Sequence, residues 1–110
     1  MKQLKINIKG QPYTICYVKN LYGSFGLTDT ENKFIYIQKI EDIEELQRTI
    51  IHELMHAYFY ECGLLEFSQS EILAYWFESH FKIINNDFIK IFQSFEPNKI
   101  KFENVIDKNK

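Results

Sequence analysis

The hydrophobic pattern of this 110-residue chain changes its period near Glu41, and this change limits the possible folds more than any other feature. Before Glu41, apolar and polar residues alternate in short runs, as they do in strands with one buried face. After it, apolar residues recur every three or four positions, as they do in amphipathic helices. The chain is long enough for one domain with a modest core and too short for two. The sequence therefore predicts an α+β domain in which a small sheet is followed by helices.

Three strands are predicted in the first forty residues. Residues 4–9 and 13–21 flank the turn residues Gly10 and Pro12, and we expect them to pair as an antiparallel hairpin. Residues 34–40, which are rich in aromatic and β-branched side chains, are expected to form the third strand. The expected sheet is therefore small and three-stranded.

The second half of the chain predicts a helical hairpin and a short C-terminal helix. A long helix is expected from about Glu41 to Gly63, because acidic residues crowd its first turns and glycine follows its last. A second helix is expected to begin near Ser68 or Ser70. The segment 85–87, which reads Asn-Asn-Asp, is predicted to break it, and a short third helix should follow. We expect one domain over residues 1–96 and a polar tail over 97–110.

Composition excludes several classes of partner. The chain has 13 basic and 15 acidic residues, so it lacks the basic surface that nucleic acid requires. No apolar run approaches the roughly 18 residues of a membrane span, and the N-terminus does not resemble a signal peptide. Cys16 and Cys62 stand apart in apolar surroundings and are interpreted as reduced core thiols. We therefore expect a cytoplasmic protein; its oligomeric state is not predicted.

The segment 49–59, TIIHELMHAYF, carries the clearest chemical pattern. Residues four apart lie on one face of a helix, so His52 and His56 should point the same way and bind one metal ion. Glu53 is rotated by about 100° from His52, close enough to act on a water without binding the metal. Zinc suits this arrangement, because a catalytic zinc keeps one position for water. The competing interpretation is a buried helix whose two histidines bind no metal. The spacing of four residues between them makes this interpretation weaker than the metal site.

The third ligand is expected on the following helix, where Glu71, Glu78 and His80 are the candidates. The two glutamates are seven residues apart, so they share a face but lie roughly 10 Å apart along the axis. Only one of them can reach the metal. Glu71 has an alternative role in a capping box with Ser68, Glu78 could be a solvated or supporting carboxylate, and His80 lies off that face. Hairpin geometry alone does not choose between the glutamates.

The segments IIHELMHAYFYECGL and SEILAYWFESHF together resemble the short zincin-type metallopeptidase domains of phages and integrated mobile elements. These domains are related to ImmA/IrrE-type peptidases within the gluzincin group, and the resemblance covers about residues 4–81. It implies a minimal zincin-like fold with His52, His56 and Glu71 as zinc ligands and Glu53 as catalytic base. Glu78 would then support a ligand histidine by accepting its N–H.

The implied activity is zinc-dependent limited proteolysis of a partner protein, such as a regulator of the mobile element. Tyr60, on the same helix face as His56, and Tyr36, on the strand nearest the helix, are candidate donors to the oxyanion. The alternative function is a non-catalytic zincin-fold module that binds a phage or host protein. Glu53 argues against this alternative, because a closed structural zinc site has no use for a carboxylate beside it.

Overall fold

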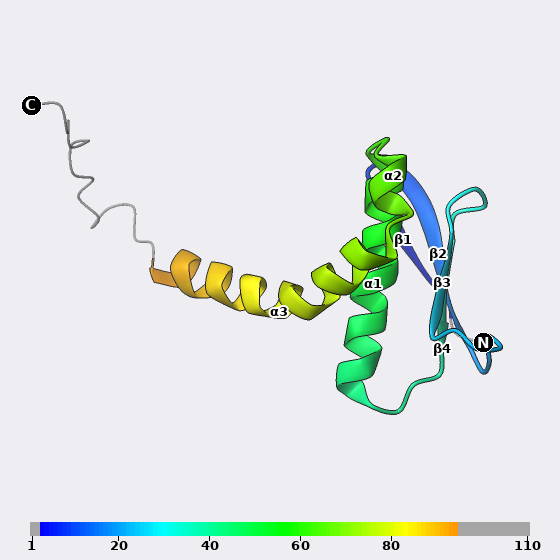
Figure 1. Cartoon of the computed structure of the whole chain (residues 1–110), viewed down its shortest axis with the longest axis horizontal. Helices are drawn as coiled ribbons and strands as arrows, with labels where there is room; N and C mark the ends of the chain where they lie inside the picture. The colour runs from blue at the N-terminus through cyan, green and yellow to red at the C-terminus, as the bar shows by residue number, and fades with distance from the viewer. Residues whose placement is uncertain (1–2, 95–110) are drawn as a thin grey trace, which may run out of the picture.

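The computed structural model describes residues 3–94, which contain four strands and three helices. In chain order these are β1 (Gln3–Ile8), β2 (Gln11–Val18), β3 (Gly26–Asp29), β4 (Phe34–Gln38), α1 (Ile43–Glu61), α2 (Leu65–Ser68) and α3 (Glu71–Ser94). Helix α1 lies beside the sheet, and α3 crosses α1 and then extends away from the body (Figure 1). The predicted α+β class is confirmed. The predicted tail over 97–110 lies outside the described residues.

The sheet is four-stranded and mixed, with the order β1-β2-β4-β3. β1 and β2 pair antiparallel as predicted, β2 and β4 pair parallel, and β3 pairs antiparallel with β4. The prediction of three strands was therefore wrong, because β3 was missed. Its four residues, GLTD, begin with a glycine and do not alternate in the way that marks a strand. The strand conformation instead comes from pairing with β4, in which Gly26 lies opposite Ile37 and Asp29 lies opposite Phe34.

The core lies between the sheet and α1. Its fully buried members come mainly from β2, β4 and the end of β1: Ile8, Tyr13, Ile15, Ile35, Ile37 and Ala57. Leu46, Ile50 and Leu54 of α1 pack against them at helical spacing. This packing fixes which face of α1 is turned to the sheet and leaves the neighbouring face free to carry polar side chains.

Both ends of α1 have local causes. Asp42 caps its start by accepting hydrogen bonds from the backbone N–H groups of Glu44 and Glu45. Gly63, whose φ is 78°, provides the left-handed turn after its end. Of the two cysteines interpreted as core thiols, Cys16 is buried but Cys62, at this helix end, is exposed.

The predicted hairpin followed by a separate short helix was also wrong. A single turn, α2, follows α1, and α3 then runs without interruption through the Asn-Asn-Asp segment at residues 85–87. Asn and Asp are less favourable than alanine inside a helix by only about 0.7 kcal/mol each or less, which does not suffice to break it. Residues 3–94 include no helix with the length and apolar character needed to cross a membrane.

Candidate metal centre

Three side chains from two helices converge beside α1. His52 and His56 lie one turn apart on α1, and Glu71 lies in the first turn of α3. The Nε2 atom of His52 is 3.1 Å from one carboxylate oxygen of Glu71, and the Nε2 atom of His56 is 2.9 Å from the other. Their ligand atoms all lie within 4.8 Å of one another, so this group could hold a metal ion.

Ser68 and Ser70 bring Glu71 to this position. The buried Ser68 hydroxyl donates to the backbone carbonyl of His56 at 2.7 Å, which ties α2 to the middle of α1. Ser70 then caps α3 by accepting from the Leu73 backbone N–H at 3.1 Å. The carboxylate of Glu71 faces the two histidines, whereas the capping box with Ser68 would have turned it back toward the chain.

In His52 and in His56, each of the two ring nitrogens has an oxygen atom close to it. Nδ1 of His52 lies 3.6 Å from a carboxylate oxygen of Glu78, and Nδ1 of His56 contacts the backbone carbonyl oxygen of Ser68. A neutral imidazole has only one N–H. If Nδ1 carries it, the two Nε2 lone pairs and the Glu71 carboxylate face one another with no hydrogen between them. A cation at their centre satisfies all of these atoms together, as does a second proton on each ring.

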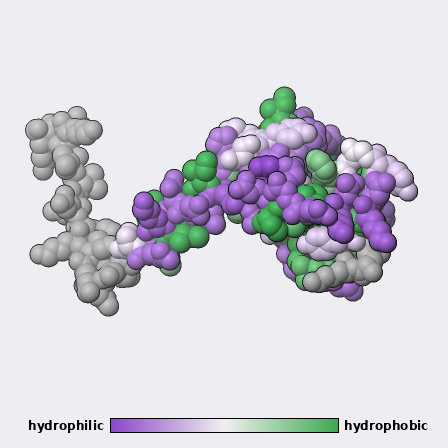
Figure 2. Space-filling model, turned by 90° about the horizontal axis from the view of Figure 1, so that it is seen from below, coloured by the Kyte–Doolittle hydropathy of each residue, from purple (hydrophilic) through white to green (hydrophobic). Residues whose placement is uncertain are grey.

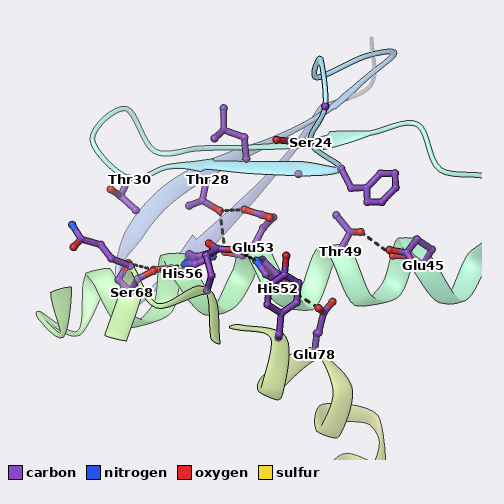
Figure 3. Close-up of a pocket in the computed structure, with 17 residues that line it drawn as sticks. Ser24, Thr28, Thr30, Glu45, Thr49, His52, Glu53, His56, Ser68 and Glu78 are labelled. Atoms are coloured by element: carbon purple, nitrogen blue, oxygen red, sulfur yellow. Dashed lines mark hydrogen bonds and ion pairs between the residues drawn. The ribbon is translucent and has the colours of Figure 1, made fainter. Parts of the chain in front are cut away.

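Glu53 is buried on α1 next to this group but faces the sheet. Its Oε1 accepts a hydrogen bond from the Thr28 hydroxyl of β3 at 2.8 Å, and the same hydroxyl lies 3.1 Å from its backbone carbonyl (Figure 3). Burial raises the pKa of the Glu53 carboxyl, while the Thr28 hydrogen bond and the nearby histidines oppose the increase. Glu53 is thus held beside the three donors without being one of them.

Strand β3 approaches Glu53 closely at a glycine. A Cβ atom on Gly26 would lie 2.7 Å from Cγ of Glu53 and 2.9 Å from its Oε2. Both Gly26 and Thr28 were missed in the sequence because β3 itself was missed. A glycine followed two residues later by threonine is too common to have marked the site.

These side chains line a cleft of about 750 Å³. It is bounded by β3 and the loop before it, by α1, and by the start of α3, and His52, Glu53 and His56 lie on its floor (Figure 3). Besides Glu71, it is lined by the carboxylate residues Glu45 and Glu78. The cleft therefore brings together the two histidines, Glu53 and both candidate glutamates, but not the third candidate ligand, His80.

The predicted oxyanion donors lie elsewhere. Among the described residues, neither Tyr36 nor Tyr60 lines the cleft, and the Tyr60 ring instead faces the Lys33 ammonium at 4.9 Å from its centroid. Tyr75 does line it, with its ring 5.0 Å from that of His52, edge to face. Tyr75 lies one turn after Glu71 on α3, and no motif singled it out.

His80, the third histidine, is half-buried on α3, and its Nδ1 lies 2.7 Å from the backbone carbonyl of Trp76. Its ring stacks on the Trp76 ring with a centroid distance of 4.4 Å. It is not part of the His52, His56 and Glu71 group. Comparison with protein-family models, with curated proteins and with solved structures found no match for this chain.

Proposed function

We propose that this protein is a zinc-dependent metallopeptidase whose active site is the cleft between β3, α1 and the start of α3. The observation that carries the proposal is the position of Glu53. A buried carboxylate lies beside a group of two histidines and one glutamate, yet its hydrogen bond to Thr28 holds it apart from them. A purely structural metal site gives no reason for this extra buried carboxylate.

The donor set fits zinc. Two imidazole nitrogens and one carboxylate oxygen are the ligands of many catalytic zinc sites, and they leave a fourth position open. The outer contacts fit as well, because ligand histidines usually donate their other N–H to a carboxylate or a backbone carbonyl. Glu78 and the Ser68 carbonyl are those partners for His52 and His56. A zinc ion held by His52, His56 and Glu71 would supply Lewis acidity, which would lower the pKa of water and polarise a peptide carbonyl.

The chain's own residues perform the proton transfers. Glu53 takes a proton from the attacking water and later delivers it to the leaving amine, as a general base and then a general acid. The Thr28 hydrogen bond fixes one oxygen of Glu53, so the other is free to meet the water. Tyr75, which lines the cleft where Tyr60 and Tyr36 do not, is the residue we propose as donor to the developing oxyanion.

The substrate that fits this cleft is an extended segment of a protein. β3 lies at one edge of the sheet, so the side of it that faces away from β4 can accept a further strand. A peptide added there would run along the wall of the cleft, past Gly26 and Thr28. The resemblance to phage and mobile-element peptidases supports a regulatory protein as the source of that segment.

The test compares Glu53→Gln with Glu66→Gln, which makes the same change at an exposed residue of α2. Each protein is reconstituted with zinc and incubated with a library of proteome-derived peptides, and new termini are counted by mass spectrometry. Glu53→Gln should keep its zinc and lose about 100-fold or more of the cleavage, since general base catalysis contributes that much. Glu66→Gln should cleave like the wild type.

Equal cleavage by wild type and Glu53→Gln would contradict the proposed role of Glu53. Zinc binding without cleavage by the wild type, either of the library or of whole-cell protein, would favour the non-catalytic module instead.

A further inference from the structure

The outer half of α3 carries a long stripe of exposed apolar side chains. Every residue from 81 to 94 is exposed. Five large side chains in this half fall on one face of the helix, and they remain 39% to 69% exposed: Phe81, Ile84, Phe88, Ile91 and Phe92. We call them the α3 stripe. Hydrophobic residues recur along the projecting arm in Figure 2.

An exposed helix of this kind needs a partner. Helical segments of about 12–15 residues are marginal in water even when rich in alanine, and the outer half of α3 contains β-branched isoleucines and two asparagines instead. The radius of gyration of the structure is 18.7 Å, whereas a compact domain of about 100 residues has roughly 13 Å. Within residues 3–94, the arm seen in Figure 1 extends away from the body, although its Lys82 ammonium donates to the Gln47 side chain of α1 at 2.7 Å. Because every residue from 81 to 94 is exposed, the arm has little of the tertiary packing that normally stabilises a helix.

The spacing of the stripe is that of a coiled coil. Phe77, Phe81, Ile84, Phe88 and Ile91 follow one another at steps of four, three, four and three residues, which is the a/d pattern of a heptad repeat. At the inner end of α3 the same face carries the buried Ala74, where the helix crosses α1. The face that packs within the chain thus continues outward as a seam suited to another helix.

We propose that the α3 stripe binds the α3 stripe of a second copy of this chain, in antiparallel orientation, to form a dimer. Antiparallel pairing centred near Asn86 sets Phe81 opposite Ile91 and Ile84 opposite Phe88. Each of these layers then combines one large ring with one smaller side chain, so the layers have similar volume. Parallel pairing would instead stack phenylalanine on phenylalanine and isoleucine on isoleucine.

Area and charge both favour a second copy. With side chains of about 150–250 Å² each, the exposed part of the stripe amounts to roughly 550 Å² per copy. Together with flanking residues, two copies reach the lower end of the ~1,200–2,000 Å² buried in stable interfaces. The charged residues of this half are Lys82, Asp87 and Lys90, and none is part of the stripe. A second copy therefore meets no repulsion along the seam, and a strongly charged partner would find no complement.

The first test is the mass of the full chain by sedimentation equilibrium, over a range of protein concentrations, for three proteins. The wild type should be a dimer that dissociates on dilution. Phe88→Glu, which places a charge in the seam, should be a monomer whose body stays folded, as judged by near-ultraviolet circular dichroism. Asn86→Glu adds the same charge to the opposite face of α3 and should remain a dimer.

The second test gives the orientation and does not require a fully stable variant. Phe81→Cys and Ile91→Cys are each made in a chain whose exposed Cys62 is replaced by serine, and the two variants are mixed under mild oxidation. The antiparallel dimer predicts disulfides that join position 81 of one copy to position 91 of the other, and few between identical positions. Predominant cross-links between identical positions would overturn the antiparallel arrangement.

A wild-type protein that is monomeric at every concentration would overturn the dimer, and the stripe would then be covered by residues 95–110, by lipid or by another protein. Equal masses of Phe88→Glu and Asn86→Glu would also overturn it. Both tests are independent of zinc, so they can fail while the proposed metallopeptidase function stands, and the reverse is also true.

Discussion

The two halves of α3 belong to the same helix but have opposite surroundings. In the inner half, Glu71 faces His52 and His56, and Ala74 is buried against the body. In the outer half, every residue from 81 to 94 is exposed, although the helix there is also rich in large apolar side chains. Hydrophobicity alone therefore does not decide which part of a helix is buried within its own chain.

What distinguishes the inner half is a set of polar anchors. Ser68 binds the His56 backbone, Ser70 caps the helix, and the Glu71 carboxylate meets two histidine rings. These contacts fix where α3 begins and therefore which residues reach α1. We therefore propose metal chemistry for the inner half and association for the outer half, and the two should respond separately to mutation.

The largest expected effect is on zinc affinity in the inner half. Glu71→Ala removes a proposed ligand and should weaken zinc binding by more than the ~10–100-fold typical of losing an outer hydrogen-bond partner. Glu78→Ala removes such an outer partner and should fall within that range. Competitive zinc titration of both variants measures the difference. Loss of zinc by Glu78→Ala, with wild-type affinity in Glu71→Ala, would reverse the two assignments.

A smaller effect is expected from Gly26→Ala, which tests how β3 positions Glu53, the proposed base. The new methyl group would lie 2.7 Å from Cγ of Glu53, so Glu53 or β3 must move. Because misplacing a catalytic group by about 1 Å can cost 100-fold, cleavage should fall by about 10- to 100-fold. Zinc affinity should change little, since Glu53 is not one of the proposed ligands.

The control for Gly26→Ala is Gly10→Ala, at a turn where φ is 87° and a Cβ has open space. Alanine there should lower the free energy of unfolding by about 1 kcal/mol, because its backbone conformation disfavours side chains. Cleavage per folded molecule should stay at the wild-type level. Equal activity in Gly26→Ala and Gly10→Ala would remove the argument that close approach of β3 positions Glu53.

The smallest effect is expected when a substitution in the outer half of α3 is tested for its effect on zinc binding, which we attribute to the inner half. Phe88→Glu should leave zinc affinity within about threefold of wild type, because residues of the outer half do not line the cleft. A tenfold change in affinity corresponds to about 1.4 kcal/mol, so a threefold change is a smaller free-energy difference than that. Zinc titration of Phe88→Glu measures it. A loss comparable to that in Glu71→Ala would show that the halves are coupled and that the distinction drawn between them fails.

The parts of this structure that were predictable from sequence are those determined by local spacing. Helix α1 with His52 and His56 on one face follows from a period of about 3.6 residues, and the β1–β2 hairpin follows from alternation around Gly10. The prediction that Glu71 lies beside the histidines depended on a resemblance. The length of the connection from α1 to α3 did not determine whether Glu71 or Glu78 would lie opposite the histidines.

The parts that were missed depend on contacts between distant residues. β3 is a strand because it pairs with β4 and packs on α1, and its own four residues do not indicate one. The continuity of α3 through residues 85–87 was missed because Asn and Asp, which disfavour a helix only weakly, were interpreted as helix breakers. Tyr75 was missed because its place in the cleft depends on how α3 crosses α1.

The most direct test of the central claim is the zinc content of the purified chain. The protein is stripped with a chelator, reconstituted with zinc, dialysed and measured by elemental analysis beside a His52→Ala, His56→Ala double variant. We expect about one zinc per wild-type chain and almost none in the double variant. Equal zinc in the two proteins, or none in the wild type, would contradict it.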